Sequence, residues 1–289
     1  MIPAADKPHV DQFVREGVVV VPRAINPTTA ESWVREAFAR LEIDEHDPAT
    51  WAGKNGLQAR THETPLAEIA PTAWAVICDL LGGADAIDPR TAIAHDGFNL
   101  NSDRGADEPW QPPSAAAGGW HKDGWFFKHF LDSPEQALLV LMIWRDIEPR
   151  SGGTFYAPDS IPLVIRDLAK HPEGVEPGHP FAACIGDCRD FREVTAKAGD
   201  IVIMHPYTLH APSRNPSGRI RVMNNKVISL KEPLRFDRPN GQYTPLERTF
   251  LNALGVDRYP FAITGERERD PDFGPLSKYR ERQAAAAAK

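Results

Sequence analysis

The run of residues 138–144 (Leu-Leu-Val-Leu-Met-Ile-Trp) constrains the fold more than any other segment, because every side chain in it is apolar. A strand with one face in water alternates apolar and polar residues, so this run predicts a strand, over residues 136–145, that is buried on both faces. Further short apolar runs predict strands at residues 91–100, 154–157, 201–205 and 220–229. Turns rich in Gly and Pro separate these runs, and the chain contains 27 Pro. Together they predict an antiparallel sandwich or barrel, in a mainly β fold with flanking helices.

The remaining segments predict a helical first third and two later helices. A β-branched run predicts one early strand at residues 18–21, and residues 42–64 are polar and irregular, as in a surface loop. Apolar side chains at helical spacing predict the helices. These helices are expected after a cap at Thr28 or Thr29, at residues 70–81 (ended by Gly82-Gly83), at 160–169 and at 245–254.

We expect one domain over residues 1–289. Its parts are a mainly helical N-terminal region (1–88) packed on the core, a β core (89–230), and a C-terminal helix and tail (231–289).

Charge and composition narrow the class of protein. The net charge is −7 and no basic cluster stands out, which argues against a nucleic-acid partner. No run approaches the roughly 18 apolar residues that span a bilayer, and the N-terminus does not resemble a secretory signal. Cys78, Cys184 and Cys188 are few and odd in number, which suits a reducing compartment. Cys184 and Cys188 lack a second pair at zinc spacing, so we expect them at packing or edge positions rather than at a metal. We therefore expect a cytoplasmic protein without a membrane partner, whose substrate is a small molecule.

Histidine followed two residues later by a carboxylate can hold a metal, but about one such match arises by chance in a chain of this composition. Three matches occur, at His9-Val10-Asp11, His121-Lys122-Asp123 and His171-Pro172-Glu173. The first lies at the start of an amphipathic run, and the third lies in a turn rich in Pro and Gly. Only His121 opens an aromatic run (residues 120–130) behind a loop, so polar ligands there would sit in an apolar pocket.

Two histidines and one carboxylate on one face of Fe(II) are typical of non-haem oxygenases. His121 and Asp123 stand at positions i and i+2 of a predicted strand, so both would point to the same face. A second histidine must come from a distant strand. His205 and His210 are the candidates. His205 lies near the end of an apolar strand, so it could instead be a structural or pocket-lining histidine.

Three segments of the chain resemble the phytanoyl-CoA dioxygenase-like branch of the Fe(II)/2-oxoglutarate oxygenases. In this family the fold is a double-stranded β-helix, the jelly roll of cupin-like proteins, with helices packed outside. The segments are residues 12–22 (Gln-Phe-Val-Arg-Glu-Gly-Val-Val-Val-Val-Pro), Gly119-Trp120-His121-Lys122-Asp123, and residues 199–210 followed by Asn215, Ser217 and Arg221.

The resemblance implies that His121, Asp123 and His210 are the iron ligands. It favours His210 over His205 because the residues that follow His210 stand at matching offsets. Among these, Arg221 would anchor the distal carboxylate of 2-oxoglutarate.

Arg219 is the alternative anchor, only two positions away. The family usually has Ser two residues after the distal histidine, whereas this chain has Pro212, which puts one expected hydrogen bond to the cosubstrate in doubt.

Other positions carry weaker expectations. Thr154 follows two glycines on a strand that should face the barrel interior, where it could bond the cosubstrate or be an ordinary strand residue. Alternation would turn Trp125 and Phe127 to the side of the ligands, where with Lys128 they could line a substrate pocket. Aromatics in a β-rich protein are equally often core, and a lysine is often a solvated surface charge.

The resemblance implies a dioxygenase that uses Fe(II), 2-oxoglutarate and O2, most simply to hydroxylate a small-molecule metabolite with release of succinate and CO2. The carboxylate of Asp123 argues against halogenation, while desaturation, epimerisation and cyclisation stay open. The sequence contains no evident signature of adenine or pantetheine binding, so we expect a small free metabolite rather than an acyl-CoA. One alternative is a cupin-like metal-dependent isomerase or hydrolase with zinc or manganese, which would not use 2-oxoglutarate. The other is a non-catalytic binding module that keeps the fold.

Overall fold

Six antiparallel strands form the main sheet of the protein, in the order β1-β9-β6-β11-β5-β2. The computed structural model describes residues 7–277, 280–281 and 284. The strands of the main sheet are β1 (Val18–Val21), β2 (Gly56–Leu57), β5 (Asn99–Asn101), β6 (Leu138–Ile143), β9 (Ile201–Met204) and β11 (Arg221–Ile228).

A smaller antiparallel sheet, in the order β10-β7-β8, faces the main sheet. His121 extends this smaller sheet by a single antiparallel bridge to His210 in β10. A separate two-stranded sheet joins β3 to β4. The strands of these two sheets are β3 (Glu63–Pro65), β4 (Ile93–His95), β7 (Phe155–Ala157), β8 (Arg192–Glu193) and β10 (Leu209–Ala211).

Two hydrophobic cores meet at the central strand β6, whose six residues are all buried. Leu138, Val140 and Met142 pack into the core beneath the helices. The alternate residues Leu139, Leu141 and Ile143 pack into a second core between the two sheets. The strand therefore has no face in water, which confirms the burial predicted from its unbroken apolar run.

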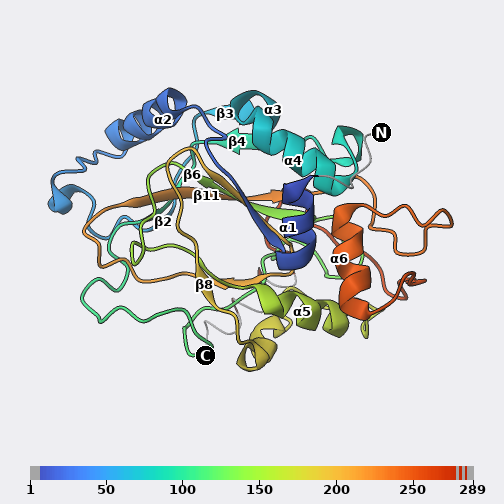
Figure 1. Cartoon of the computed structure of the whole chain (residues 1–289). Coiled ribbons are helices and arrows are strands. Elements are labelled where there is room, and N and C mark those ends of the chain that lie inside the picture. The colour runs from blue at the N-terminus through green and yellow to red at the C-terminus, as the bar shows by residue number, and fades with distance from the viewer. Residues whose placement is uncertain (1–6, 278–279, 282–283, 285–289) are drawn as a thin grey trace.

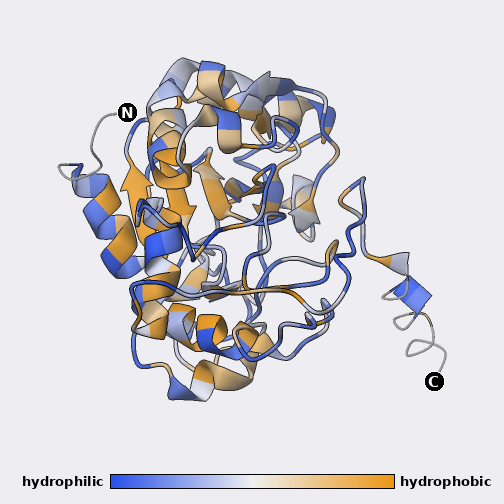
Figure 2. Cartoon of the chain, turned by 90° about the vertical axis from the view of Figure 1, so that its right-hand side faces the viewer, coloured by the Kyte–Doolittle hydropathy of each residue, from blue (hydrophilic) through white to orange (hydrophobic). Residues whose placement is uncertain are grey.

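Helices cover the outer face of the main sheet and the ends of the sandwich (Figure 1). Figure 2 shows strands that are hydrophobic along their length, whereas the helices carry both hydrophobic and hydrophilic side chains, as expected of elements with one face in water. The α-helices are α1 (Pro8–Glu16), α2 (Pro27–Arg40), α3 (Leu66–Ile69), α4 (Pro71–Leu81), α5 (Ile161–Leu168) and α6 (Pro245–Leu254), and the 3-10 helices are η2 (Pro48–Thr50), η3 (Ala84–Ala86), η4 (Pro158–Ser160) and η5 (Phe181–Asp187).

The predicted elements are present, with local corrections. The expected cap at Thr28 or Thr29 is wrong, because the side chain of Asn26 accepts the hydrogen bond from the backbone N–H of Thr28. The single strand expected at residues 91–100 is broken into β4 and β5. Between them the carboxylate of Asp96 accepts hydrogen bonds from the backbone N–H groups of Thr61 and His62, which turns the chain. The loop expected at residues 42–64 contains η2, β2 and the start of β3.

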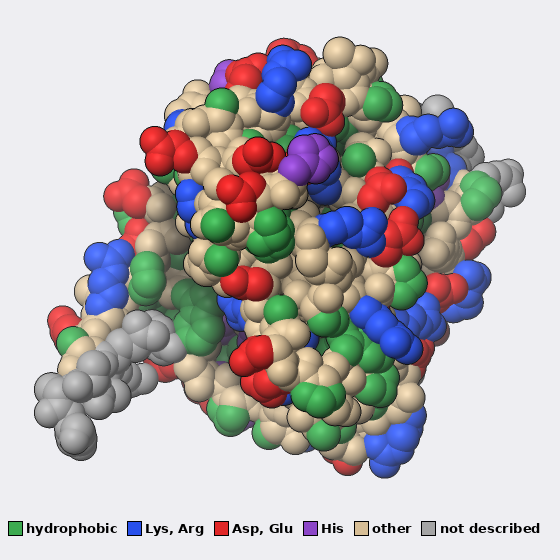
Figure 3. Space-filling model, turned by 90° about the vertical axis from the view of Figure 1, so that its left-hand side faces the viewer, with side chains coloured by type: hydrophobic (Ala, Val, Ile, Leu, Met, Phe, Trp, Pro, Cys, Tyr) green, Lys and Arg blue, Asp and Glu red, His purple; other side chains and the backbone are tan. Residues whose placement is uncertain are grey.

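The two facing antiparallel sheets, with helices outside them, confirm the predicted mainly β fold of the jelly-roll type. In the described part of the chain, no helix is both long and apolar enough to cross a bilayer. Figure 3 shows acidic and basic side chains mixed on one face of the molecule, without a large area of a single sign. Cys78, Cys184 and Cys188 are free thiols.

Candidate metal centre

The alternation of β10 decides where His210 points. Leu209 and Ala211 pack into the core beneath the helices, which we call the outer core. The side chain of His210 between them therefore points to the interior between the sheets. His121 lies beside it, because the backbone N–H of each residue donates to the carbonyl oxygen of the other, at 2.9 and 3.0 Å. Two histidines that are 89 residues apart in sequence are thus neighbours across a pair of backbone hydrogen bonds.

The carboxylate of Asp123 lies between the two imidazoles. Its Oδ1 is 3.4 Å from Nε2 of His121, and its Oδ2 is 3.5 Å from Nε2 of His210. The ring centroids of the histidines are 4.3 Å apart. These three side chains form a group whose ligand atoms all lie within 4.8 Å of one another, a spacing that one metal ion can bridge.

Hydrogen bonds at the far side of each ring define which nitrogen is free. Nδ1–H of His121 donates to the carbonyl oxygen of Gly119 at 2.7 Å, and Nδ1–H of His210 donates to that of Thr208 at 3.1 Å. A carbonyl oxygen only accepts, so both Nδ1 atoms carry hydrogen and both Nε2 lone pairs face Asp123. Within the part of the chain that the structure describes, Nε2 of His210 is buried without a hydrogen-bond partner. A buried polar atom without a partner is costly, and a metal ion between these atoms would satisfy it.

The electrostatics of the cluster favour a charged carboxylate. Burial alone would raise the pKa of Asp123, but the neighbouring His210 and His121 outweigh it and hold that pKa far below its usual range. Burial lowers the pKa of His121, while the neighbouring carboxylate of Asp123 raises it, and the net shift is upward. Two neutral nitrogen donors and one anionic oxygen donor are the set that suits a divalent iron ion.

The segment after Asp123 differs from the prediction. His121 forms only a single bridge, and Gly124 has φ +127°, so the chain turns instead of continuing as a strand. A Cβ atom at Gly124 would lie 2.4 Å from Cε1 of His129, which leaves room for glycine alone. The expectation that Trp125 and Phe127 share the side of the ligands is therefore wrong: Trp125 is 43% exposed and Phe127 is 0% exposed. Lys128 is partly buried, and its Nζ lies 5.5 Å from the ring centroid of Phe130.

Lys122, between the two ligands, is buried behind them. Its Nζ donates to the carbonyl oxygen of Asp123 at 3.0 Å, to Nδ1 of His129 at 3.0 Å and to Oε1 of Gln136 at 3.2 Å. Burial lowers the pKa of Lys122 to about 7. His129 is buried in the same network. The sequence offered no signal for this, because an isolated lysine is usually exposed.

Arg221 is a buried cation that has no acidic partner among residues 7–277, 280–281 and 284. It begins β11 on the same face as Met223, which packs in the core between the sheets, so Arg221 also points inward. Only 7% of it is exposed. In the described part of the chain, its hydrogen bonds go to the carbonyl oxygens of Gly152 and Asn99 and to Oδ1 of Asn99, at 3.2–3.3 Å, and its Nε has no partner. Burial lowers the pKa of Arg221 to about 10. Arg219 is exposed.

The loop between His210 and Arg221 is held by Asn215. Its side-chain N–H groups donate to the carbonyl oxygens of Asn101 and Arg219, both at 2.7 Å, and its Oδ1 accepts from the hydroxyl of Ser217 at 2.6 Å. Pro212 lies over Gly119, where a Cβ atom would meet its ring at 3.1 Å.

Thr154 is buried next to β11. Its hydroxyl lies 3.9 Å from Sδ of Met223, on the inner face of the main sheet. Asn99, which contacts Arg221, carried no sequence signal, because a single asparagine in a short strand is unremarkable.

His205 lies in the outer core and is satisfied by the protein. Its Nε2 is 2.9 Å from the hydroxyl of Thr249, and its Nδ1 accepts from the backbone N–H of Tyr207. Burial, together with the charge of Lys122, lowers the pKa of His205 to about 3. Both nitrogens are engaged, so neither is free to bind a metal.

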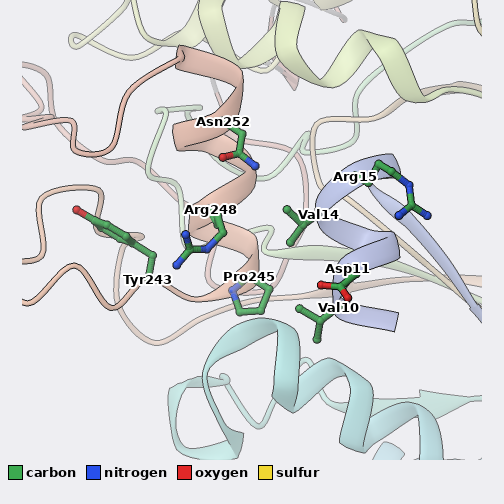
Figure 4. Close-up of a pocket in the computed structure, with 8 residues that line it drawn as sticks. All are labelled: Val10, Asp11, Val14, Arg15, Tyr243, Pro245, Arg248 and Asn252. Carbon is green, nitrogen blue, oxygen red and sulfur yellow. The ribbon is translucent and has the colours of Figure 1, made fainter. Parts of the chain in front are cut away.

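A surface groove of about 590 Å³ lies elsewhere, between α1 and α6 (Figure 4). Its lining includes Val10 and Val14 from α1 and Arg248 and Asn252 from α6. None of its lining residues belongs to the His121, Asp123 and His210 group, so the groove is not the site of this chemistry.

Comparison with known proteins places the metal cluster and Arg221 inside one matched region. A family model described as phytanoyl-CoA dioxygenase matches residues 13–223. No significant match is found among curated protein sequences.

Several solved structures resemble this one at low sequence identity. The epimerase SnoN, in complex with Fe3+, alpha-ketoglutarate and nogalamycin RO, is 18% identical with a TM-score of 0.50, and the match covers 95% of this chain and 96% of that one. EvdO2 from Micromonospora carbonacea var. aurantiaca, complexed with 2-oxoglutarate, is 13% identical over 79% of this chain and 91% of that one, with a TM-score of 0.45. A prolyl-4-hydroxylase from Pseudomonas putida is 11% identical over 78% and 98%, with a TM-score of 0.40.

Proposed function

Because this chain belongs to the phytanoyl-CoA dioxygenase family, we propose that it is an Fe(II)- and 2-oxoglutarate-dependent dioxygenase that hydroxylates a small-molecule metabolite. The observation that carries this proposal is the buried Nε2 of His210, which has no hydrogen-bond partner among the described residues and faces the carboxylate of Asp123 beside His121. These three side chains would hold the iron. Iron held there would supply, with 2-oxoglutarate and O2, an oxidation in which 2-oxoglutarate would become succinate and CO2 and one oxygen atom would be added to the substrate.

Arg221 is the residue that we assign to the distal carboxylate of 2-oxoglutarate. A planar guanidinium can hold a carboxylate by two parallel charge-assisted hydrogen bonds. Arg221 is buried on the inner face, and in the described structure its hydrogen-bond partners are all uncharged and its Nε has none. A buried cation of this kind is costly unless an anion accompanies it. The exposure of Arg219 supports Arg221 over its neighbour.

The protein's other contributions are orientation and exclusion of water. Nδ1–H bonds to the carbonyl oxygens of Gly119 and Thr208 keep both Nε2 lone pairs on the metal side, so that ligand geometry exists before metal binds. We also assign Thr154 a hydrogen bond to the cosubstrate, because it is buried between the sheets with its hydroxyl 3.9 Å from Sδ of Met223. Of the aromatic residues after Asp123, only Trp125 stays a candidate for substrate contact, because Phe127 is enclosed in the core.

Anaerobic visible absorbance tests the proposal without knowledge of the substrate. Fe(II) followed by 2-oxoglutarate should produce a weak charge-transfer band that requires both additions. The variant Asp123→Ala should abolish the band, whereas Asp107→Ala, which changes an exposed aspartate, should keep it. Iron binding without a band would transfer the assignment to the metal-dependent isomerase or hydrolase. Absence of iron binding would leave a binding module.

A further inference from the structure

A second group of metal-ligating side chains lies outside the site described above. It consists of Asp167, His171 and His179, whose ligand atoms lie within 4.8 Å of one another, as in the first group. We propose that this group is a second binding site for a divalent transition-metal ion, of which zinc is the simplest probe.

Local structure brings these residues together. Asp167 lies in the last turn of α5, and His171 follows it by four residues in a turn where its N–H donates to the carbonyl oxygen of Leu168. His179 returns from the next loop, where its N–H donates to the carbonyl oxygen of Glu176. The helix end and two successive turns thus determine the position of three donors, as a metal site requires.

The two imidazoles approach the two oxygens of one carboxylate. Nε2 of His179 is 2.7 Å from Oδ2 of Asp167, and Nε2 of His171 is 3.9 Å from Oδ1. The ring centroids of the histidines are 5.6 Å apart. All three side chains are partly exposed, at 21–39%, so a metal ion could reach them and keep water as a further ligand.

Glu173 supplies the feature that separates this group from an ordinary surface pair. Its Oε1 lies 2.8 Å from Nδ1 of His171. A carboxylate on the far nitrogen of a histidine is the usual outer partner of a metal ligand, because it orients the ring and directs the Nε2 lone pair at the metal. When His171 is neutral, this lone pair faces Oδ1 of Asp167, another acceptor, with no hydrogen between them.

Charge also fits a divalent ion. Two neutral imidazoles with the carboxylates of Asp167 and Glu173 carry a net charge of −2, which one divalent cation neutralises. Nitrogen donors combined with carboxylate oxygen suit zinc, nickel or copper better than magnesium or calcium, which prefer oxygen alone.

The site would brace the segment that carries the catalytic ligands. The ring of His179 packs edge-on against Phe181 at 4.8 Å, and Nζ of Lys122 lies 5.5 Å from the centroid of the same Phe181 ring. The loop between His171 and His179 is tied to that segment by two backbone hydrogen bonds between Val175 and His129. A metal at the second site would therefore connect α5 to the network of Lys122 and His129 that lies behind the first site.

Zinc stoichiometry tests this inference independently of the first site. In the variant His121→Ala/Asp123→Ala, which removes the catalytic cluster, equilibrium dialysis and elemental analysis should still find one zinc per chain. Adding His171→Gln/His179→Gln should remove it, whereas adding His9→Gln should leave it. His9 is a matched control, because it makes a single contact with one carboxylate, that of Asp79, at 3.1 Å.

A milder variant guards against loss of folding. Glu173→Gln keeps all three ligands and should weaken zinc binding by about 10- to 100-fold, as is usual when an outer partner of a ligand is lost. The proposal is overturned if the catalytic-cluster variant binds no zinc, or if its zinc persists without His171 and His179. It is also overturned if Glu173→Gln, folded by circular dichroism, binds zinc as tightly as its parent.

Discussion

Arg221 provides the sharpest test of how this protein would bind its cosubstrate. If its guanidinium holds the distal carboxylate of 2-oxoglutarate, Arg221→Met removes two charge-assisted hydrogen bonds while it keeps most of the side-chain volume. Each such bond contributes roughly 1.5–3 kcal/mol, and water in the vacated space recovers part of that. A net loss of about 3 kcal/mol corresponds to a rise in Kd of about 150-fold. Arg221→Lys keeps the charge but not the forked geometry, and we expect a loss of about 10-fold.

The assay is an anaerobic titration of 2-oxoglutarate into iron-loaded protein, followed by the charge-transfer band. Arg219→Met is the matched control, because Arg219 is two positions away and exposed, and it should change the Kd less than about 2-fold. A parallel titration with 2-oxobutyrate, which lacks the distal carboxylate, isolates the contact. Wild type should discriminate strongly between the two acids, and Arg221→Met should not.

The stability of the variant separates lost binding from lost folding. All hydrogen-bond acceptors of Arg221 in the described chain are uncharged, and burial opposes its charge. The free energy of unfolding of Arg221→Met should therefore differ from that of wild type by less than about 1 kcal/mol. Unchanged 2-oxoglutarate affinity in Arg221→Met, or loss of affinity in Arg219→Met, would refute the assignment of the anchor.

Further expectations concern the surroundings of the site. Lys122→Met removes the hydrogen bond to the backbone of a ligand and should weaken iron binding about 10-fold in a competition titration, and an unchanged affinity would deny it a positioning role. His205 has a pKa of about 3 when folded and about 6.5 when unfolded, so the unfolded chain binds the extra proton between these values. The contribution of His205 to the free energy of unfolding should therefore fall by about 1.4 kcal/mol per pH unit between pH ~6.5 and pH ~3, and His205→Asn should reduce the measured slope by about that amount in urea titrations. Gly124→Ala should destabilise the protein by about 2 kcal/mol or more, because its Cβ would strike the ring of His129, whereas Gly118→Ala, with open space around it, should be neutral. Equal stability of the two glycine variants would contradict this account of the turn.

Local sequence patterns were sufficient to predict most helices and strands and the burial of the central strand. The apolar run at residues 138–144 predicted burial on both faces, because only a strand between two cores avoids polar side chains altogether. Helix ends were also readable where the signal is local, as at Gly82, which ends α4 with positive φ. Long-range contacts broke the predicted strand at residues 91–100, because Asp96 binds backbone groups more than 30 residues away.

Alternation failed where one backbone angle changed direction. The expectation for Trp125 and Phe127 assumed a continuous strand after Asp123. The positive φ of Gly124 turned the chain, exposing one ring and burying the other. No pattern in the sequence distinguishes a glycine that turns the chain from one within a strand, because the backbone conformation of a glycine depends on the residues packed around it.

What the sequence by itself determined is therefore the fold class, the family resemblance and the identity of the residues with metal-binding chemistry. Spacing of apolar residues and the donor types of side chains are properties of the chain itself. Only the tertiary structure decided that His210 faces inward while His205 is satisfied in the outer core, and that Arg221 is buried without an anion while Arg219 is exposed. It also brought Asp167, His171 and His179 around one point. Direction, burial and proximity arise from contacts between segments far apart in the chain, and a linear pattern does not contain them.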